Sequence, residues 1–150
     1  MKDPTSTTFL HQHLVQFVET DMAGIVHFSN FFRFMEEAED AFLRHVGVPL
    51  VGDIEGKHVS LPRLSASCDY RHPARYGDRL QVAVQIKELR EKTIRYRFRF
   101  STDQHLVAEG EILAIYCEFA ERLRSIPITP AMREKLLPHL MDSTTVNPTP

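Results

Sequence analysis

From Asn30 to Gly47 the chain reads NFFRFMEEAEDAFLRHVG, and this stretch decides the fold. Its apolar residues recur at intervals of three and four, as they do on one face of a helix; they are Phe31, Phe34, Met35, Ala38, Ala41, Phe42 and Val46. Charged residues fill most of the other face, namely Glu36, Glu37, Glu39, Asp40 and Arg44. Gly47 and then Pro49 end the pattern. The spacing therefore predicts a long amphipathic helix from Asn30 to about Val46.

The segments around this helix show the signs of β-strands. Apolar and polar residues alternate through residues 80–87 and 93–100, and the segment Leu106 to Phe119 continues in the same style. Residues Phe9 to Val18, before the helix, also read as a strand. Pro62 interrupts a further strand over residues 59–70, which favours an edge or a bulge there.

Two shorter segments complete the pattern. Residues Val51 to His58 contain glycine and read as a loop. Thr129, followed by Pro130, has the pattern of an N-cap with proline at the first helical position, which predicts a short last helix.

The order of elements predicts an α+β fold with a curved antiparallel sheet wrapped around one long helix. A single long helix must bury its apolar face, and the sheet is the only partner available. A length of 150 residues favours one domain. We place this domain at residues 9–141. The ends, 1–8 and 142–150, are rich in Ser, Thr, Pro and Asn and are predicted to be disordered tails.

The composition excludes several classes of function. A formal net charge of −2 does not favour the broad basic surface that binding to duplex nucleic acid requires. No stretch reaches the length of a membrane span, and the N-terminus lacks the apolar region of a secretory signal. Cys68 and Cys117 lie far apart without metal-type spacing, as two free thiols would. We therefore expect a cytoplasmic protein that binds neither nucleic acid nor membrane.

The segment between the first strand and the long helix holds the candidate chemistry. Asp21 supplies a carboxylate, and the helix that follows presents backbone N–H groups without intrahelical partners. Together they could polarise a carbonyl group and attack it, or activate a water that does so. By position alone, an aspartate before a helix is more often a cap or turn residue.

A resemblance adds to this interpretation. The string Asp21-Met22-Ala23-Gly24-Ile25-Val26, with Asn30 and Arg33 after it, closely resembles the opening motif of the 4-hydroxybenzoyl-CoA thioesterase family of hotdog-fold enzymes. The likeness covers roughly residues 9–135. Within that range residues 65–70 resemble the family's second strand, 87–93 its mid-sheet turn and 121–124 its C-terminal strand.

The resemblance implies a hotdog-fold acyl-CoA thioesterase. It implies that Asp21 is the nucleophile or general base and that the backbone N–H of Phe28 polarises the thioester carbonyl. Gly24 would let the chain pass close to the acyl group, since it has no Cβ. The substrate and its coenzyme A portion would contact His27, Asn30, Arg90, Lys92 and Arg124, the last three through phosphates.

The same resemblance implies the wider setting of the reaction. No separate cofactor is expected, because coenzyme A is part of the substrate. The chain is expected to form homodimers that pair into tetramers, with the active site at a subunit interface. Related hotdog enzymes place a catalytic carboxylate on this helix, but with Asp21 present Glu36 and Glu37 read as residues of the solvated face, and Glu36 is also a candidate to support Asp21. There are two departures from the family pattern: Glu91 separates Arg90 from Lys92, and His27 stands where an aromatic residue is common.

Several alternatives stay open. The substrate could be carried by acyl carrier protein instead of coenzyme A, or the chain could bind acyl-CoA without catalysis. A hotdog dehydratase is disfavoured, because no paired histidine and acid is evident around Asp21. No G-x-S-x-G elbow supports a serine hydrolase. His11 and His13 share one face of a strand, but no third ligand is identifiable and we predict no metal site.

Overall fold

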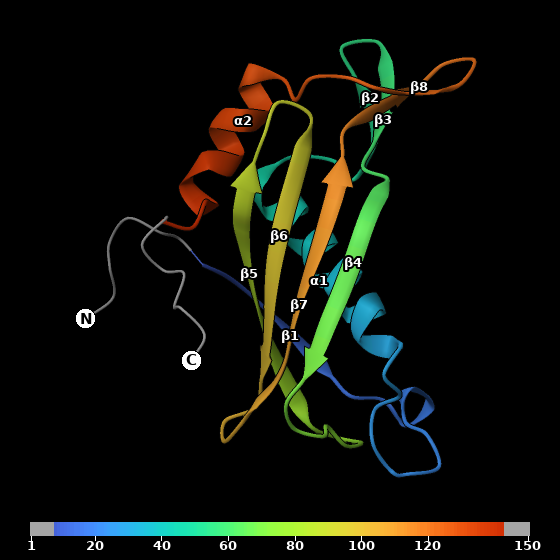
Figure 1. Ribbon diagram of the computed structural model, residues 1–150, viewed down its shortest axis with the longest axis vertical. Helices are drawn as coiled ribbons and strands as arrows, with labels where there is room; N and C mark the ends of the chain where they lie inside the picture. The colour runs from blue at the N-terminus through green and yellow to red at the C-terminus, as the bar shows by residue number, and fades with distance from the viewer. Residues whose placement is uncertain (1–7, 143–150) are drawn as a thin grey trace.

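The computed structural model describes residues 8–142, which form two antiparallel sheets and a few helices (Figure 1). The larger sheet has the order β1-β5-β6-β7-β4, with bounds Phe9–Leu14 (β1), Arg79–Leu89 (β5), Thr93–Ser101 (β6), Leu106–Ile115 (β7) and Arg63–Tyr70 (β4). The smaller sheet has the order β2-β3-β8-β9, with bounds Val51–Ile54, Lys57–Ser60, Cys117–Phe119 and Leu123–Ser125. The helices are α1 (Asn30–Val46) and α2 (Pro130–Leu136), with 3-10 turns η1 (Phe17–Glu19) and η2 (Leu137–His139). The predicted α+β class is confirmed.

The predicted long helix is confirmed at both ends. It begins at Asn30 and ends at Val46, where Gly47 adopts a left-handed conformation with φ of 74°. The Gly47 N–H donates to the carbonyl of Arg44, which closes the last turn. The short last helix is also confirmed, because the Thr129 side chain accepts a hydrogen bond from the Met132 N–H.

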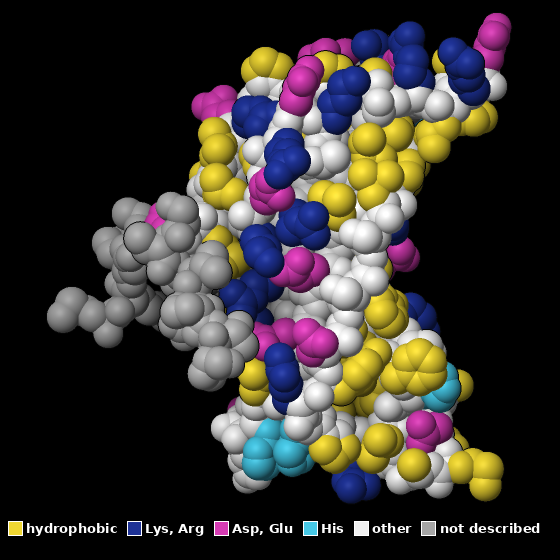
Figure 2. All heavy atoms as spheres, viewed as in Figure 1, with side chains coloured by type: hydrophobic (Ala, Val, Ile, Leu, Met, Phe, Trp, Pro, Cys, Tyr) yellow, Lys and Arg dark blue, Asp and Glu magenta, His cyan; other side chains and the backbone are white. Residues whose placement is uncertain are grey.

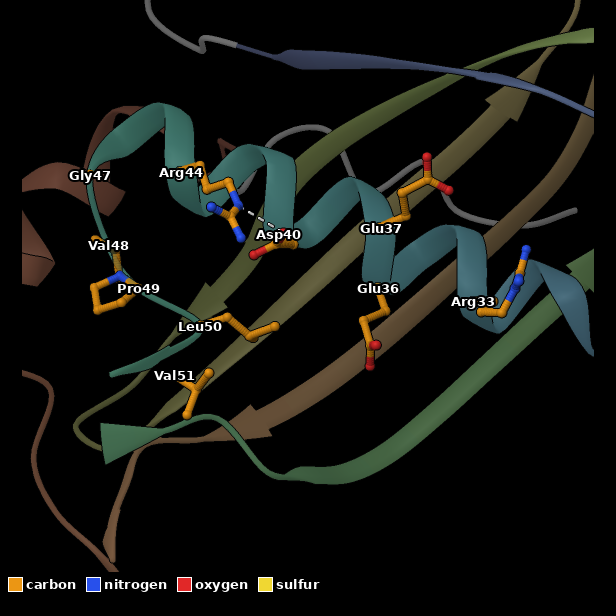
Figure 3. Close-up of a pocket in the computed structure, with 10 residues that line it drawn as sticks. All are labelled: Arg33, Glu36, Glu37, Asp40, Arg44, Gly47, Val48, Pro49, Leu50 and Val51. Carbon is orange, nitrogen blue, oxygen red and sulfur yellow. Dashed lines mark hydrogen bonds and ion pairs between the residues drawn. The ribbon is translucent and has the colours of Figure 1, made fainter. Parts of the chain in front are cut away.

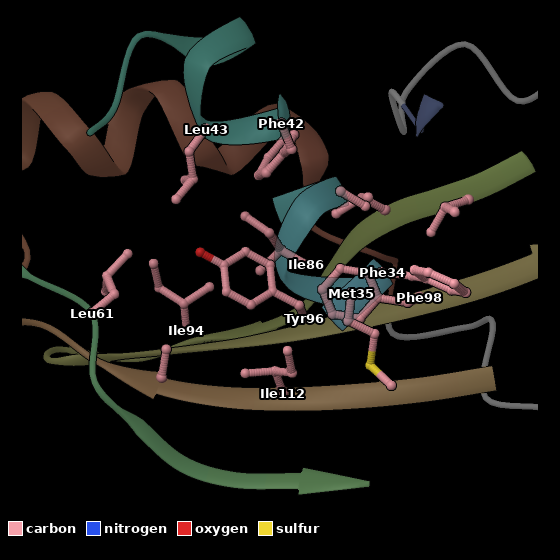
Figure 4. Close-up of a cluster of buried hydrophobic side chains, with 14 of the residues drawn as sticks. Phe34, Met35, Phe42, Leu43, Leu61, Ile86, Ile94, Tyr96, Phe98 and Ile112 are labelled. Atoms are coloured by element: carbon pink, nitrogen blue, oxygen red, sulfur yellow. The ribbon is translucent and has the colours of Figure 1, made fainter. Parts of the chain in front are cut away.

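The apolar face of α1 packs against the inner face of the larger sheet (Figure 4). Phe34, Met35 and Phe42 are fully buried there. The sheet contributes alternate residues of two neighbouring strands, all fully buried: Leu80, Val82, Val84 and Ile86 from β5, and Ile94, Tyr96, Phe98 and Phe100 from β6. Each such side chain contributes roughly 1.5–3 kcal/mol by leaving water. This contact fixes the position of α1 on the sheet.

The outer face of the larger sheet carries charged side chains, as the alternation predicted. Arg95, Arg97 and Arg99 point outward from β6 and meet carboxylates of the neighbouring strands. Glu109 of β7 lies 3.1 Å from Arg97 and 3.2 Å from Arg99. Figure 2 shows these charges as a mixed row down the face of the sheet.

Three details of the sequence-based prediction were wrong. Residues 51–58 form the hairpin of β2 and β3 instead of a loop. The predicted strand Leu106 to Phe119 breaks at Tyr116, where the chain leaves the larger sheet for β8 of the smaller one. The first strand ends at Leu14, and η1 replaces its last residues. The predicted tails lie outside the described residues apart from Thr8 and Asp142, so that prediction stays untested.

Glu39 is buried, although it was placed on the polar face of α1. Its Oε1 accepts a hydrogen bond of 2.8 Å from Arg63 Nη1, at the start of β4. Burial raises the pKa of Glu39 in spite of that partner. The ion pair ties α1 to the strand at the edge of the larger sheet.

Strand β4 is an edge strand, as the proline at position 62 predicted. It pairs with β7 on one side and is the last strand in the sheet order. The register shifts between Arg63 and Ser65, and Leu64 is 56% exposed. A long edge with exposed apolar side chains is a surface that other strands can join.

Gly110 of β7 leaves space for the side chain of Met35 on α1. A Cβ added there would lie 2.5 Å from Met35 Cε and 3.0 Å from the carbonyl oxygen of Ser67. We therefore expect Gly110→Ala to lower the free energy of unfolding by about 1–3 kcal/mol, because the core is overpacked. Urea unfolding followed by circular dichroism measures this. The outward-facing Glu111→Ala is the control and should cost less than about 1 kcal/mol; equal stability of Gly110→Ala and wild type would refute the packing argument.

Candidate active site

The loop that bears Asp21 is closed by hydrogen bonds between its two halves. Asp21 N–H donates to the carbonyl of Ile25 at 2.9 Å, and Thr20 bridges Val26. Gly24 has φ of 76°, a conformation that favours glycine, and its N–H donates to the carbonyl of Asp21. The loop therefore folds back on itself and brings Asp21 beside the residues that lead into α1.

The side chain of Asp21 is exposed to solvent. One carboxylate oxygen, Oδ1, accepts a hydrogen bond of 2.8 Å from the Ala23 N–H. This contact makes a turn within the loop and limits the rotation of the carboxylate. A Cβ at Gly24 would approach Arg75 Nη1 at 3.8 Å, an ordinary contact distance. The structure thus gives backbone conformation, and not lack of space within the chain, as the reason for glycine at position 24.

Phe28 lies in the turn just before α1, with its ring 61% exposed. Its carbonyl accepts a hydrogen bond of 2.9 Å from the hydroxyl of Tyr70, at the end of β4. Within residues 8–142, no backbone hydrogen bond has the Phe28 N–H as its donor. This N–H, two residues before the first residue of α1, is therefore available to an acceptor.

The buried side chain of Glu19 anchors the loop that bears Asp21. The Glu19 carboxylate is buried and accepts contacts from the Gln16 N–H at 2.8 Å, His13 Nε2 at 2.9 Å and Arg33 Nη2 at 2.6 Å. Burial alone would raise the pKa of Glu19, but these donors outweigh it and lower the pKa below its ordinary value of 4.5. Glu19 is therefore a buried anion that joins β1, η1 and α1.

The predicted substrate contacts His27 and Asn30 lie on the same loop. His27 N–H donates to the carbonyl of Glu19 at 3.0 Å, and its ring Nδ1 lies 2.7 Å from Ser29 Oγ. Asn30 Nδ2 donates to the same carbonyl at 2.8 Å. The amide of Asn30 thus orders the loop. The exposed His27 ring packs beside Phe28, with centroids 4.7 Å apart.

Glu37 is exposed, as predicted, with 45% of its side chain accessible, and it pairs with two histidines of β1. Its Oε1 lies 3.1 Å from His11 Nε2 and its Oε2 lies 2.9 Å from His13 Nδ1. His13 thereby sits between Glu37 and Glu19. No group of three or more metal-ligating side chains with a geometry for an ion is found in the described part of the chain.

A groove of about 860 Å³ runs along the exposed side of α1 (Figure 3). It is lined by Arg33, Glu36, Glu37, Asp40, Arg44 and residues 47–51. Asp21 does not line it, but Arg33, at one end, also contacts Glu19 beneath the Asp21 loop. Glu36 lies in the groove with its Oε2 3.5 Å from Arg63 Nη2. In a single subunit the groove and the Asp21 loop are therefore neighbours and not one site.

The three predicted phosphate-binding cations lie at the opposite end of the sheet from Asp21 (Figure 1). The Asp21 loop lies near the start of β5, since Val26 N–H donates to Ala74 and Arg75 Nη1 to Gly24. Arg90 and Lys92 form the turn at its far end. A strand of 11 residues spans roughly 36 Å. The cations are thus too distant to share a ligand with Asp21 of the same subunit.

Arg90 and Arg124 each pair with a glutamate at that far end. Arg90 Nε contacts Glu88 and Arg124 Nη2 contacts Glu118. These cations lower the pKa of both carboxylates. Both arginines are largely exposed, so they remain accessible to an anionic ligand.

Sequence reasoning missed Glu19 as a residue of this site. The only sequence signal was its place two residues before Asp21, within VETD. Its burial depends on His13 and Arg33, which come from separate elements, and a sequence pattern does not reveal contacts between distant elements.

No helix among residues 8–142 has the length and apolar character that a membrane crossing needs.

Comparisons with known proteins match most of the chain. Residues 15–136 fit the model of the thioesterase-like superfamily. A putative esterase of Aquifex aeolicus is 33% identical over 126 residues, covering 77% of this chain and 98% of that protein. A 1,4-dihydroxy-2-naphthoyl-CoA hydrolase of Synechococcus elongatus is 30% identical, covering 76% and 85%. The crystal structure of a 1,4-dihydroxy-2-naphthoyl-CoA thioesterase from Synechocystis superimposes with a TM-score of 0.77 at 26% identity, covering 87% and 96%.

The lowered pKa of Glu19 predicts a pH dependence of stability. A carboxylate with a lowered folded-state pKa contributes fully above the unfolded value of 4.5, and the contribution is lost as pH falls through the folded pKa. We expect Glu19→Gln to cost about 1.5–3 kcal/mol near pH 7, the worth of hydrogen bonds to a charged group. Urea unfolding from pH 7 to pH 3 should show the two proteins converging below pH 4.5. A constant difference down to pH 3 would contradict the ionised state of Glu19.

Proposed function

This chain belongs to the thioesterase-like superfamily, and from that premise we propose that it hydrolyses the thioester bond of an acyl- or aryl-CoA to the free acid and coenzyme A. The resemblance drawn from the Asp21 motif is thereby confirmed at the level of the family. We assign it the hotdog arrangement, with the larger sheet curved around α1. Two observations support hydrolysis most: the Asp21 carboxylate is exposed, and the Phe28 N–H, in the same segment between η1 and α1, donates to no backbone carbonyl.

The chemistry needs only these groups and water. As general base, Asp21 takes a proton from water while the water oxygen bonds to the thioester carbonyl carbon. As nucleophile, its carboxylate forms a mixed anhydride that water then cleaves. In either route the carbon–sulfur bond breaks and the electron pair leaves on the thiolate. A thiolate is a good leaving group, so its departure needs no strong general acid.

The carbonyl oxygen gains negative charge in both routes. The Phe28 N–H and the positive end of α1 would stabilise that charge. The His27 carbonyl, which shares a peptide group with the Phe28 N–H, accepts a hydrogen bond of 3.0 Å from the Asn30 N–H, and the Phe28 carbonyl in the next peptide group accepts one from Tyr70. His27 is proposed to orient the water or the acyl carbonyl, and Asn30 to keep the loop in place through Glu19.

A second subunit is proposed to complete the site. Strand β4 is an exposed edge of the larger sheet. If it paired with β4 of a second subunit, the sheet would continue across a two-fold axis. Antiparallel pairing of the two edges would bring the far end of one subunit to the Asp21 end of the other. Arg90, Lys92 and Arg124 of one subunit would then hold coenzyme A phosphates for the Asp21 of its partner, and dimers would pair into tetramers.

We propose an aromatic acyl group as the first substrate class to test. Relatives at 30% and 26% identity carry names of a hydrolase and a thioesterase of 1,4-dihydroxy-2-naphthoyl-CoA. Phe28 is exposed and belongs to the same segment as Asp21, so its ring suits contact with an aromatic group. A thiol-release screen across aryl-, short- and long-chain acyl-CoAs, with matched carrier-protein thioesters, identifies the substrate. Binding without thiol release in every case would favour a non-catalytic protein.

Asp21→Asn tests the central residue. We expect kcat to fall by about 10²–10⁴-fold, because the variant lacks the base or nucleophile, while the thermal unfolding midpoint changes little. Thiol release from the best aryl-CoA measures this. Asp103→Asn, in the exposed β6–β7 turn, is the matched control and should keep full activity. Full activity in Asp21→Asn would refute the assignment.

Mixed oligomers test whether the site is shared between subunits. One subunit carries Asp21→Asn, and the other carries Arg90→Ala with Lys92→Ala, each variant alone giving little activity at low substrate concentration. If the site is shared, random pairing of refolded subunits restores about a quarter of the wild-type kcat, with wild-type KM. If each subunit holds its own site, no wild-type site forms and the low KM does not return.

A further inference from the structure

Glu19 lies beneath the proposed site without belonging to its reacting groups. It is 3% exposed and its carboxylate meets donors from three directions: His13 of β1, the Gln16 N–H before η1, and Arg33 of α1. A buried carboxylate is stable only with such partners, so its position is fixed by all of them together. The end of the loop that leads into Asp21 is therefore anchored.

The backbone of the same residue anchors the other end of the loop. The carbonyl oxygen of Glu19 accepts hydrogen bonds from the His27 N–H at 3.0 Å and from Asn30 Nδ2 at 2.8 Å. His27 directly precedes Phe28, whose N–H is the proposed oxyanion donor. Glu19 thus anchors both halves of the loop. It lies two residues before Asp21, and its carbonyl is hydrogen-bonded to His27, the residue before Phe28.

We propose that Glu19 is a positioning residue for the hydrolysis, and that its ionised carboxylate sets the geometry between Asp21 and the Phe28 N–H. This inference rests on the proposed function. Arg33, which contacts Glu19 from α1 and also lines the groove, takes part in the same positioning. A misplacement of about 1 Å in a catalytic arrangement costs up to about 10²-fold in rate.

The charge matters because each carboxylate oxygen faces an obligate donor, the Gln16 N–H at Oε2 and Arg33 at Oε1. In Glu19→Gln the shape is kept, but the amide NH₂ replaces an acceptor by a donor. It would then face the Gln16 N–H and His13, or Arg33. At least one donor-to-donor contact arises in either orientation, and relief of it moves the loop.

The ion pairs of Glu19 extend through His13 to Glu37 and His11, away from the loop that bears Asp21. His13 Nδ1 contacts Glu37, which also contacts His11, and these residues lie on β1 and α1. The proposed positioning therefore runs through Glu19 and its partner Arg33, and its test needs no change in Asp21 or Phe28.

The test compares Glu19→Gln with wild type in the whole oligomer on the best aryl-CoA. We expect kcat to fall about 10- to 100-fold with KM within about 3-fold, and the acid limb of the pH–rate profile to keep its position. The matched control is Glu109→Gln, another carboxylate held by several arginines but on the outer sheet face, whose kcat should stay within about 2-fold.

Three other results would each contradict the proposal or one of its parts. A folded Glu19→Gln with kcat within about 2-fold of wild type contradicts it. Loss of the acid limb would make Glu19 a reacting group instead of a positioning one. Wild type without thiol release on any thioester refutes the proposed function itself, and this inference with it.

A second variant keeps the test decisive if Glu19→Gln does not fold. Arg33→Met removes one partner of Glu19 from a side chain that is 63% exposed, so the fold should tolerate it. We expect kcat to fall about 3- to 10-fold, with the oligomer and its unfolding midpoint close to wild type. An unchanged kcat in this variant contradicts the proposal.

Discussion

The burial of one face of α1 against the larger sheet is the contact on which the rest of the molecule depends. Phe34, Met35 and Phe42 fill the space above β5 and β6, and Gly110 leaves space for the side chain of Met35. Because this packing fixes the first turn of α1, it also fixes where the unpaired N–H groups at the helix start point. The chemistry proposed for the Asp21 loop uses that fixed direction, which a helix free in solvent would not provide.

Two buried carboxylates pair with cations around α1, one near its start and one near its middle. Near its start, Glu19 pairs with Arg33 and His13; near its middle, Glu39 pairs with Arg63 of the edge strand. The two ion pairs connect α1 to opposite edges of the sheet, β1 and β4. One of them lies under the proposed catalytic loop, and the other lies at the edge where a second subunit is proposed to join. The proposed catalytic loop and the proposed assembly edge are thereby both connected to α1.

The elements with a clear period could be predicted from the sequence, whereas features that depend on meetings between distant elements could not. The spacing of Phe31 to Val46 predicted α1 from Asn30 to about Val46, and Pro62 favoured an edge or a bulge where β4 begins. Glu39 was misplaced, because its partner Arg63 lies 24 residues away. The cations Arg90, Lys92 and Arg124 were predicted from the resemblance alone, and only the length of β5 reveals their distance from Asp21. The roles of Asp21 and Phe28 remain proposals.

The central claim is that Asp21 and the Phe28 N–H face the same thioester carbonyl. A crystal structure of the protein with a non-hydrolysable aryl-CoA analogue tests it most directly. In this analogue a methylene group lies between the carbonyl carbon and the sulfur, so that a ketone replaces the thioester. We expect the ketone oxygen about 2.7–3.1 Å from the Phe28 nitrogen and an Asp21 oxygen about 3–3.5 Å from the ketone carbon, or one water away. The result that would contradict the account is an analogue bound along the groove of α1, with its ketone far from Phe28 and with Asp21 exposed to solvent.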